Sequence, residues 1–248
     1  MKRTYEKPEA EVISVEEEYG PNAIIKCTSN ATYDSSDERF KHVTINGYGD
    51  IAYLSRYNLL SDGTLMSSEW DYDADASCLL SRAQYDAAAA NGYASLSSDE
   101  WTYLLNSRAA STINGVANAR FVKCKFQDKR GLLIFPDEFV WPANAGAAPD
   151  ATAINNASAN YDTIIPQAYA GILSSLGCVF LPADGYVTDG SLKSVNVAGN
   201  YWTSSTYSAS DSYVVDFGSY RSGSSTSCDW TINRIPNSDC VSVRPYFK

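Results

Sequence analysis

The segment from Asn200 to the end of the chain constrains the fold most, because the composition changes there. Serine dominates, and tyrosine, aspartate, glycine and threonine recur. Such a composition also occurs in disordered segments. However, Tyr201-Trp202 and residues 213–217 and 241–247 are β-prone and aromatic, and they bracket the polar stretches as strands bracket loops. We therefore expect an ordered C-terminal region of strands and polar loops, held outward by a rigid body.

Short strands are predicted for the body that carries this region. An opening hairpin is expected from Val43–Ile45 and Ile51–Leu54, because Asn46-Gly47 between them favours a tight turn. Three further strands are expected at Ala119–Phe126, Gly131–Phe135 and Cys178–Leu181.

Helices are predicted at three places between these strands. The clearest spans Ser97–Arg108, where Ser97 and Glu100 form a capping box ahead of an apolar face. A second is expected over Pro166–Leu176 with Gly177 as its terminator, and a shorter third over Ala83–Asn91. Helices and short strands together predict a mixed α+β domain.

Length and composition suit one large domain with a short appendage, at 248 residues and 27.0 kDa. Residues 1–38 are expected to form the appendage, a strand at Ala10–Val15 followed by a polar linker. Residues 39–248 then form the domain, and the appendage is interpreted as its tether.

The charge balance excludes some partners. Lys+Arg number 19 and Asp+Glu 29, for a net charge of −10, so a phosphate backbone would be repelled and nucleic acid is not expected as a partner. No apolar run could span a bilayer or serve as a secretory signal, so membrane insertion is not expected either. A virion or a cell surface is favoured over the cytoplasm as the location.

Most catalytic and metal-binding patterns are missing. His42 is the single histidine, and neither a nucleophile elbow nor a phosphate-binding glycine loop occurs. The alternation Asp71, Asp73, Asp75 resembles the start of an EF-hand loop, but Ala76 stands where that loop needs glycine. No catalytic residue, metal site or cofactor is therefore predicted.

Two weaker possibilities stay open. Paired carboxylates for glycoside hydrolysis leave little trace in a sequence, and Asp137, Glu138 and Asp184 are the candidates. The six cysteines form no CxxC pair; Cys228 and Cys240 would be the first choice for a disulfide, although idle thiols are favoured.

The chemistry that remains is recognition at the C-terminal surface. Tyrosine offers a large contact area with few torsions, and serine, glycine and asparagine add adaptable hydrogen bonds. The alternative is an ordinary polar turn region without a partner. The predicted ligand-binding residues are Tyr201, Trp202, Tyr207, Ser208, Ser210, Asp211, Tyr213, Asp216, Ser219, Tyr220, Arg221, Ser222, Ser224, Asp229, Trp230, Asn233, Arg234, Asn237 and Asp239, with Ser212 and Ser225 beside them.

Five stretches occur in an order that resembles a known family. They are residues 96–106, 131–137, 179–186, 201–205 and 241–245. Together they resemble C-type lectin-like domains, in the branch related to formylglycine-generating enzymes and the "major paralogous" surface domains, over roughly Phe40 to Lys248. The resemblance implies an α+β fold with paired first and last strands, two main helices, small antiparallel sheets and long C-terminal loops that bind a ligand.

The resemblance also implies a partner and a source of diversity. Some relatives are variable proteins of diversity-generating retroelements, whose adenine-directed changes enrich Asn, Ser, Tyr and Asp, as found over Tyr207–Asp239. The expected partner is a cell-surface protein or glycan, bound by a receptor-binding or adhesin-type module at a phage tail or cell surface in gut bacteria. The calcium signatures Glu-Pro-Asn and Trp-Asn-Asp are missing. The alternatives are a carbohydrate-active or formylglycine-generating-like enzyme, or a structural surface protein.

Overall fold

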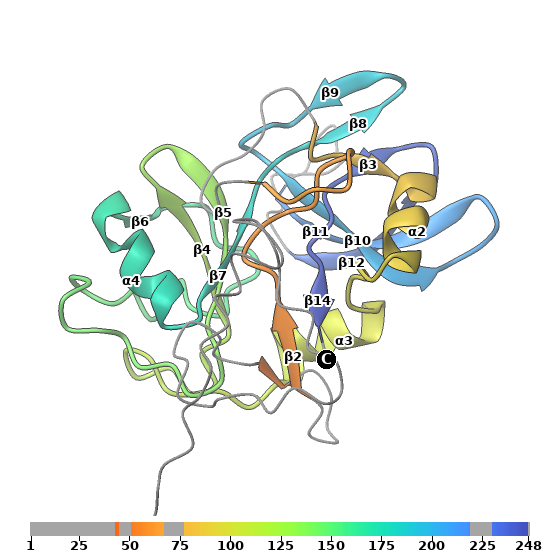
Figure 1. The fold of residues 1–248 in the computed structure, drawn as a ribbon. Coiled ribbons are helices and arrows are strands. Elements are labelled where there is room, and N and C mark those ends of the chain that lie inside the picture. Colours follow the sequence, from red (N-terminus) through yellow and green to blue (C-terminus); the bar gives the residue numbers. More distant parts are fainter. Residues whose placement is uncertain (1–42, 45–50, 67–76, 219–229, 248) are drawn as a thin grey trace, which may run out of the picture.

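The computed structural model describes residues 43–44, 51–66, 77–218 and 230–247, and these residues form a mixed α+β fold with short helices and several small sheets (Figure 1). The antiparallel pairing of the predicted opening hairpin is confirmed, with β1 (Val43–Thr44) beside β2 (Ile51–Leu54). Ile45 and the predicted tight turn at Asn46-Gly47 lie outside the described residues. The last strand, β14 (Tyr246–Phe247), pairs antiparallel with β2. Strands from near the two ends of the described chain therefore pair, although the partner of the last strand is β2 and not the first described strand, β1. The predicted appendage, His42 and Asp71–Asp75 lie outside the described residues.

A four-stranded sheet forms one side of the molecule, in the order β6 (Thr163–Ile165), β4 (Phe121–Phe126), β5 (Lys129–Ile134) and β7 (Val179–Pro182). Gly131 permits β5 and β7 to approach closely, because a Cβ there would lie 2.4 Å from the backbone oxygen of Leu181. The predicted strands at these places are confirmed, with ends shifted by one or two residues.

The second predicted helix packs beside this sheet. It starts as the 3-10 turn η3 (Gln167–Tyr169), continues as α4 (Ala170–Ser175), and is followed by Gly177 at a φ of 85°. A buried cluster that includes Phe126, Leu173 and Phe180 joins helix and sheet.

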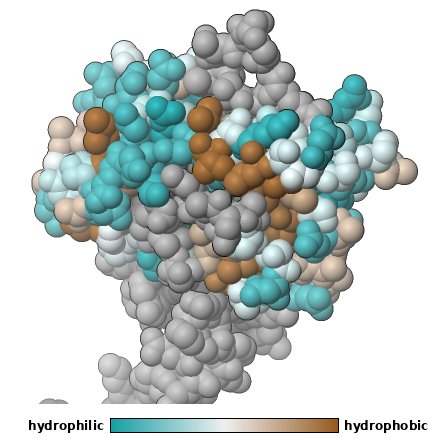
Figure 2. All heavy atoms as spheres, turned by 90° about the horizontal axis from the view of Figure 1, so that it is seen from above, coloured by the Kyte–Doolittle hydropathy of each residue, from teal (hydrophilic) through white to brown (hydrophobic). Residues whose placement is uncertain are grey.

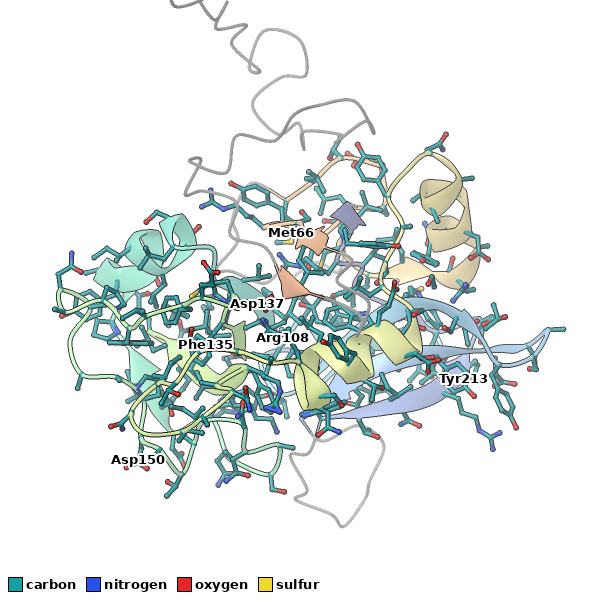
Figure 3. The ribbon with its side chains drawn as sticks, turned by 90° about the horizontal axis from the view of Figure 1, so that it is seen from below. Met66, Arg108, Phe135, Asp137, Asp150 and Tyr213 are labelled. Atoms are coloured by element: carbon teal, nitrogen blue, oxygen red, sulfur yellow. The ribbon has the colours of Figure 1, made fainter. Side chains whose placement is uncertain are left out.

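The helix predicted at Ser97–Arg108 is confirmed at its start and differs in its second half. Ser97 caps α3 (Ser98–Thr102) in a capping box with Glu100, whose carboxylate accepts from the Ser97 N–H at 2.8 Å. The chain then continues as the π-helical turn η2 (Tyr103–Ser107). Arg108 follows, fully buried, and donates to the carbonyl oxygens of Leu104 and Phe135 and to the carboxylate of Asp137. Figure 3 shows Arg108 and Asp137 close together in the middle of the molecule.

The remaining helix, α2 (Arg82–Ala90), follows β3 (Leu80–Ser81), and confirms the third prediction. The strand β3 that precedes this helix belongs to a second four-stranded sheet, ordered β3, β13 (Cys240–Val241), β8 (Tyr186–Thr188) and β9 (Ser191–Lys193). Figure 2 shows the face above β8 and β9, which is largely hydrophilic with a small apolar area. None of the described helices is long and apolar enough to cross a bilayer.

The C-terminal region contributes an antiparallel sheet of β10 (Gly199–Thr206), β11 (Asp211–Phe217) and β12 (Thr231–Pro236). Tyr201 and Val215 on one face join a core with Trp101 of α3, whereas Trp202 and Val214 on the other face join a second core. Because both faces are covered near its centre, this sheet is part of the framework and not a loose appendage.

Candidate functional site

The hairpin that connects β10 and β11 is ordered by its own side chains. The Ser208 hydroxyl accepts from the N–H groups of Ser210 and Asp211, at 3.2 and 3.1 Å. The hydroxyls of Ser210 and Ser208 donate to the Asp211 carboxylate, at 2.7 and 3.1 Å. These bonds, with nearby Arg234, hold the pKa of Asp211 below its ordinary value. The hairpin tip is therefore preorganised without a ligand.

Tyr207, Tyr213 and Arg234 gather beside this tip, and we call them the tyrosine–arginine patch. The two tyrosine rings meet edge to face with centroids 5.7 Å apart, and the Arg234 guanidinium lies 4.7 Å from the centre of the Tyr207 ring. Tyr213 and Arg234 are directly opposite on β11 and β12. Tyr207 is 51% exposed and Arg234 is exposed, so the patch faces solvent. Figure 3 shows Tyr213 at the outer part of the sheet, far from Asp150 on the other side of the molecule.

Asn237 clamps the hairpin tip onto the sheet. Its backbone N–H donates to the carbonyl of Ser210 at 2.8 Å, and its side-chain amide donates to the carbonyl of Ala209 at 3.2 Å. Its amide oxygen accepts from the buried Ser212 hydroxyl at 2.7 Å. The half-buried Asn237 therefore positions the tip.

Arg82, the first residue of α2, contacts strand β10 of the sheet that carries the patch. Its guanidinium is buried above the rings of Tyr85 and Trp202, pairs with Asp86 at 2.9 Å, and donates to the carbonyl of Thr203 at 3.0 Å. The sequence contained no signal for this role, because Arg82 and Thr203 are far apart along the chain.

The structure brings together part of the predicted site. Exposed or half-buried near the tyrosine–arginine patch and along β12 are Tyr207, Ser208, Ser210, Asp211, Tyr213, Trp230, Asn233, Arg234 and Asn237. Ser219, Tyr220, Arg221, Ser222, Ser224, Ser225 and Asp229 lie outside the described residues.

Four predicted contact residues are corrected, because they are buried. The Tyr201 hydroxyl donates to the Pro182 carbonyl at 2.7 Å, and the Trp202 indole N–H donates to the Leu80 carbonyl at 2.7 Å. Both side chains are fully buried, and their polar groups bond to the backbone in the interior. The carboxylate of Asp239 accepts from the Thr188 hydroxyl at 3.0 Å. Asp216 is 4% exposed. None of the four can offer a large surface to a partner.

Asp216 is unusual among the described carboxyls. Burial raises its pKa from 3.8 to about 7, although a hydrogen bond from Asn233 and the charge of Lys123 favour ionisation. The residue opposite on β10 is Asn200, whose amide is also fully buried. The Asp216 carboxyl, whose pKa is near neutral, is therefore buried against the same sheet that carries the patch.

Two of the three carboxylates considered for glycoside hydrolysis, Asp137 and Asp184, have structural partners. Asp137 pairs with buried Arg108. Asp184 is fully buried and accepts from the Asn58 amide and the Ser242 hydroxyl, both at 2.6 Å. Glu138 is exposed. These positions give no pair of solvent-accessible carboxyls facing a common cleft.

Two of the described cysteines, Cys124 and Cys240, are thiols with reduced reactivity. Burial raises the pKa of Cys124 well above its ordinary value, and burial and Asp239 raise that of Cys240. A protonated thiol is a poor nucleophile. No disulfide joins Cys78, Cys124, Cys178 and Cys240 to one another, and the predicted partner of Cys240, Cys228, lies outside the described residues.

Comparison with protein-family models, curated proteins and solved structures finds no match to this chain.

Proposed function

We propose that this chain is a ligand-binding module of the receptor-binding or adhesin type, whose tyrosine–arginine patch contacts a cell-surface protein or glycan. The observation that carries the proposal is the preorganised exposure of Tyr207, Tyr213 and Arg234 beside a self-bonded hairpin tip. Tyrosine and arginine are enriched among the residues that dominate binding energy. Their fixed geometry also lowers the entropy lost on association.

The proposal includes a C-type lectin-like fold. It is supported by the antiparallel pairing of β2 with β14, and by ordered elements at the stretches that carry the resemblance, including α3, β5 and β7. Diversification by a retroelement is part of the same proposal, because exposed Tyr and Ser side chains of the hairpin project from a sheet whose two faces are packed by other residues. Genome sequences of related strains should then show substitutions confined to adenines of a matching template repeat; a locus without that repeat contradicts diversification.

A binding array of cell-surface proteins and glycans tests the function. Wild type would be compared with Tyr207→Ala, Tyr213→Ala and Arg234→Ala, each checked by circular dichroism. If the patch is the contact surface, at least one variant should weaken binding about thirtyfold, which corresponds to about 2 kcal/mol.

Tyr169→Ala supplies the matched control. This half-buried tyrosine ends η3, directly before α4, and Figure 1 shows α4 on the other side of the molecule from β10, β11 and β12. Its binding should equal that of wild type. Equal binding by all three patch variants would place the contact surface elsewhere and contradict the proposal.

A further inference from the structure

A hollow of about 450 Å³ lies at the other end of β12 from Arg234. Leu105 and Phe121 line it with buried side chains and form an apolar floor. The half-buried indole of Trp230, the residue before β12, forms one wall. Trp230 and Arg234 are four positions apart in the sequence, about 13 Å along a strand, so the hollow and the tyrosine–arginine patch are separate places on one sheet.

The polar lining has the character of a recognition site. The Asn106 side chain is exposed at the end of η2, and its amide makes no hydrogen bond within the described part of the chain. The exposed Ser158 adds a hydroxyl on the opposite loop. An exposed amide and hydroxyl above an apolar floor can bind a ligand that has both C–H faces and hydroxyl groups.

Arg120 is the charged residue among those that line the hollow. Its backbone is held by the Asn155 side chain, whose oxygen accepts from the Arg120 N–H at 2.7 Å. Its guanidinium donates to the Asn118 carbonyl at 2.8 Å through Nη1, while Nε is buried with no hydrogen-bond partner among the described residues. The described ion pairs belong to Arg82 and Arg108. Partial burial removes solvent from the Arg120 guanidinium and so lowers its pKa.

The surroundings of the hollow add positive charge. Lys123 is fully buried, and its ammonium donates to the carbonyl of Ala157, a residue that itself lines the hollow. No aspartate or glutamate is among the described lining residues. The Lys123 charge also acts on the buried Asp216 carboxyl, so Arg120 is the charge that an anion in the hollow would meet directly. In such a partly desolvated place charge-assisted hydrogen bonds are strongest.

We propose that this hollow binds a pyranose that carries a carboxylate, such as a uronic acid unit of a glycan. The indole of Trp230 would stack on the C–H face of the sugar, and Asn106 and Ser158 would bind its hydroxyls. Arg120 would take its carboxylate through the Nη1 and Nη2 groups, because Nε is buried. The inference does not depend on the tyrosine–arginine patch, and a hollow of about 450 Å³ has room for a sugar ring.

Titration with glucuronate and with glucose, followed by NMR at the indole N–H signals, tests this inference. A single acidic sugar should bind with a Kd on the order of 1 mM and shift the Trp230 signal, assigned with Trp230→Phe. Glucose should bind at least about tenfold more weakly, because it lacks the charged group. Equal affinity for the two sugars, or no shift of the Trp230 signal by glucuronate, would overturn the inference.

Variants of Arg120 test whether its guanidinium binds the carboxylate of the sugar. Arg120→Gln should weaken glucuronate binding about tenfold or more, and Arg120→Lys, which keeps the charge and loses the fork, should lie between that variant and wild type. Lys193→Gln, a change on exposed β9, is the control and should leave glucuronate binding unchanged. If Arg120→Gln does not fold, the lysine variant and the comparison of the two sugars still decide the outcome. If the wild-type protein binds a ligand on the array through the patch but does not bind glucuronate, only this inference is refuted. If it binds glucuronate but the patch variants do not change its binding on the array, only the proposed function is refuted.

Discussion

Replacing Asp216 with asparagine should stabilise the protein above neutral pH. Burial raises the pKa of this carboxyl from 3.8 to about 7. The folded chain therefore binds more protons than the unfolded chain between these two values, so the free energy of unfolding falls as pH rises through that interval. The stability associated with Asp216 is complete below pH 3.8 and is lost once the pH has passed about 7.

The magnitude follows from the two pKa values. Each pKa unit corresponds to about 1.4 kcal/mol, so ionisation of Asp216 in the folded chain costs about 4 kcal/mol. The Asn233 hydrogen bond and the Lys123 charge are already included in the raised pKa. Asparagine has nearly the same shape as a protonated aspartate, and it keeps a carbonyl oxygen that can accept from Asn233. The variant should thus match wild type at low pH and exceed its stability by about 4 kcal/mol at high pH.

Urea unfolding, followed by tryptophan fluorescence at several values between about pH 4 and about pH 8.5, measures the difference between variant and wild type. Charge effects common to both chains cancel in that difference. Asp211→Asn is the control: folding lowers the pKa of this exposed carboxyl, so its stabilising contribution is present above the unfolded pKa and is lost as pH falls through the folded one. The control should show no gain at high pH. A stability difference for Asp216→Asn that does not change with pH would refute the reasoning.

Three further predictions concern the framework of the site. Arg82→Leu should cost about 1–3 kcal/mol in thermal unfolding, because the Thr203 carbonyl loses its charged donor; unchanged stability would show that water replaces it. Asn237→Ala should speed hydrogen exchange at the Ser210 and Asp211 amides and weaken ligand binding, because the clamp on the hairpin tip is lost; unchanged exchange would contradict the clamp. Gly131→Ala should destabilise by about 1–3 kcal/mol or more in urea, because its Cβ would fall 2.4 Å from the Leu181 oxygen; a neutral result would mean that β5 and β7 can move apart.

Local elements could be predicted from the sequence, because each depends on residues within a few positions. The capping box of Ser97 and Glu100 starts α3, and Gly177 adopts the positive φ that follows α4. The π-helical turn after α3 was not predictable in the same way. It places Arg108 in the interior beside Asp137, a residue that is distant in sequence.

The candidate site was predicted in part. Residue types alone indicated that Tyr207, Tyr213 and Arg234 suit recognition, and the structure brings them together because β11 pairs with β12 in the register that sets Tyr213 opposite Arg234. The hollow at Arg120 was not predicted, because its lining comes from segments that meet only in the folded chain.

The residue pattern indicated that the C-terminal region would contain strands, since aromatic and β-branched residues are enriched in its apolar segments and favour a sheet. Only the tertiary structure decided which of those residues are buried. Tyr201 and Trp202 point to opposite faces of β10, and both are buried because a core covers each face. The sequence of a strand does not specify which segments pack against it. Burial, and with it the pKa of Asp216, therefore depends on contacts between segments that are distant in the sequence.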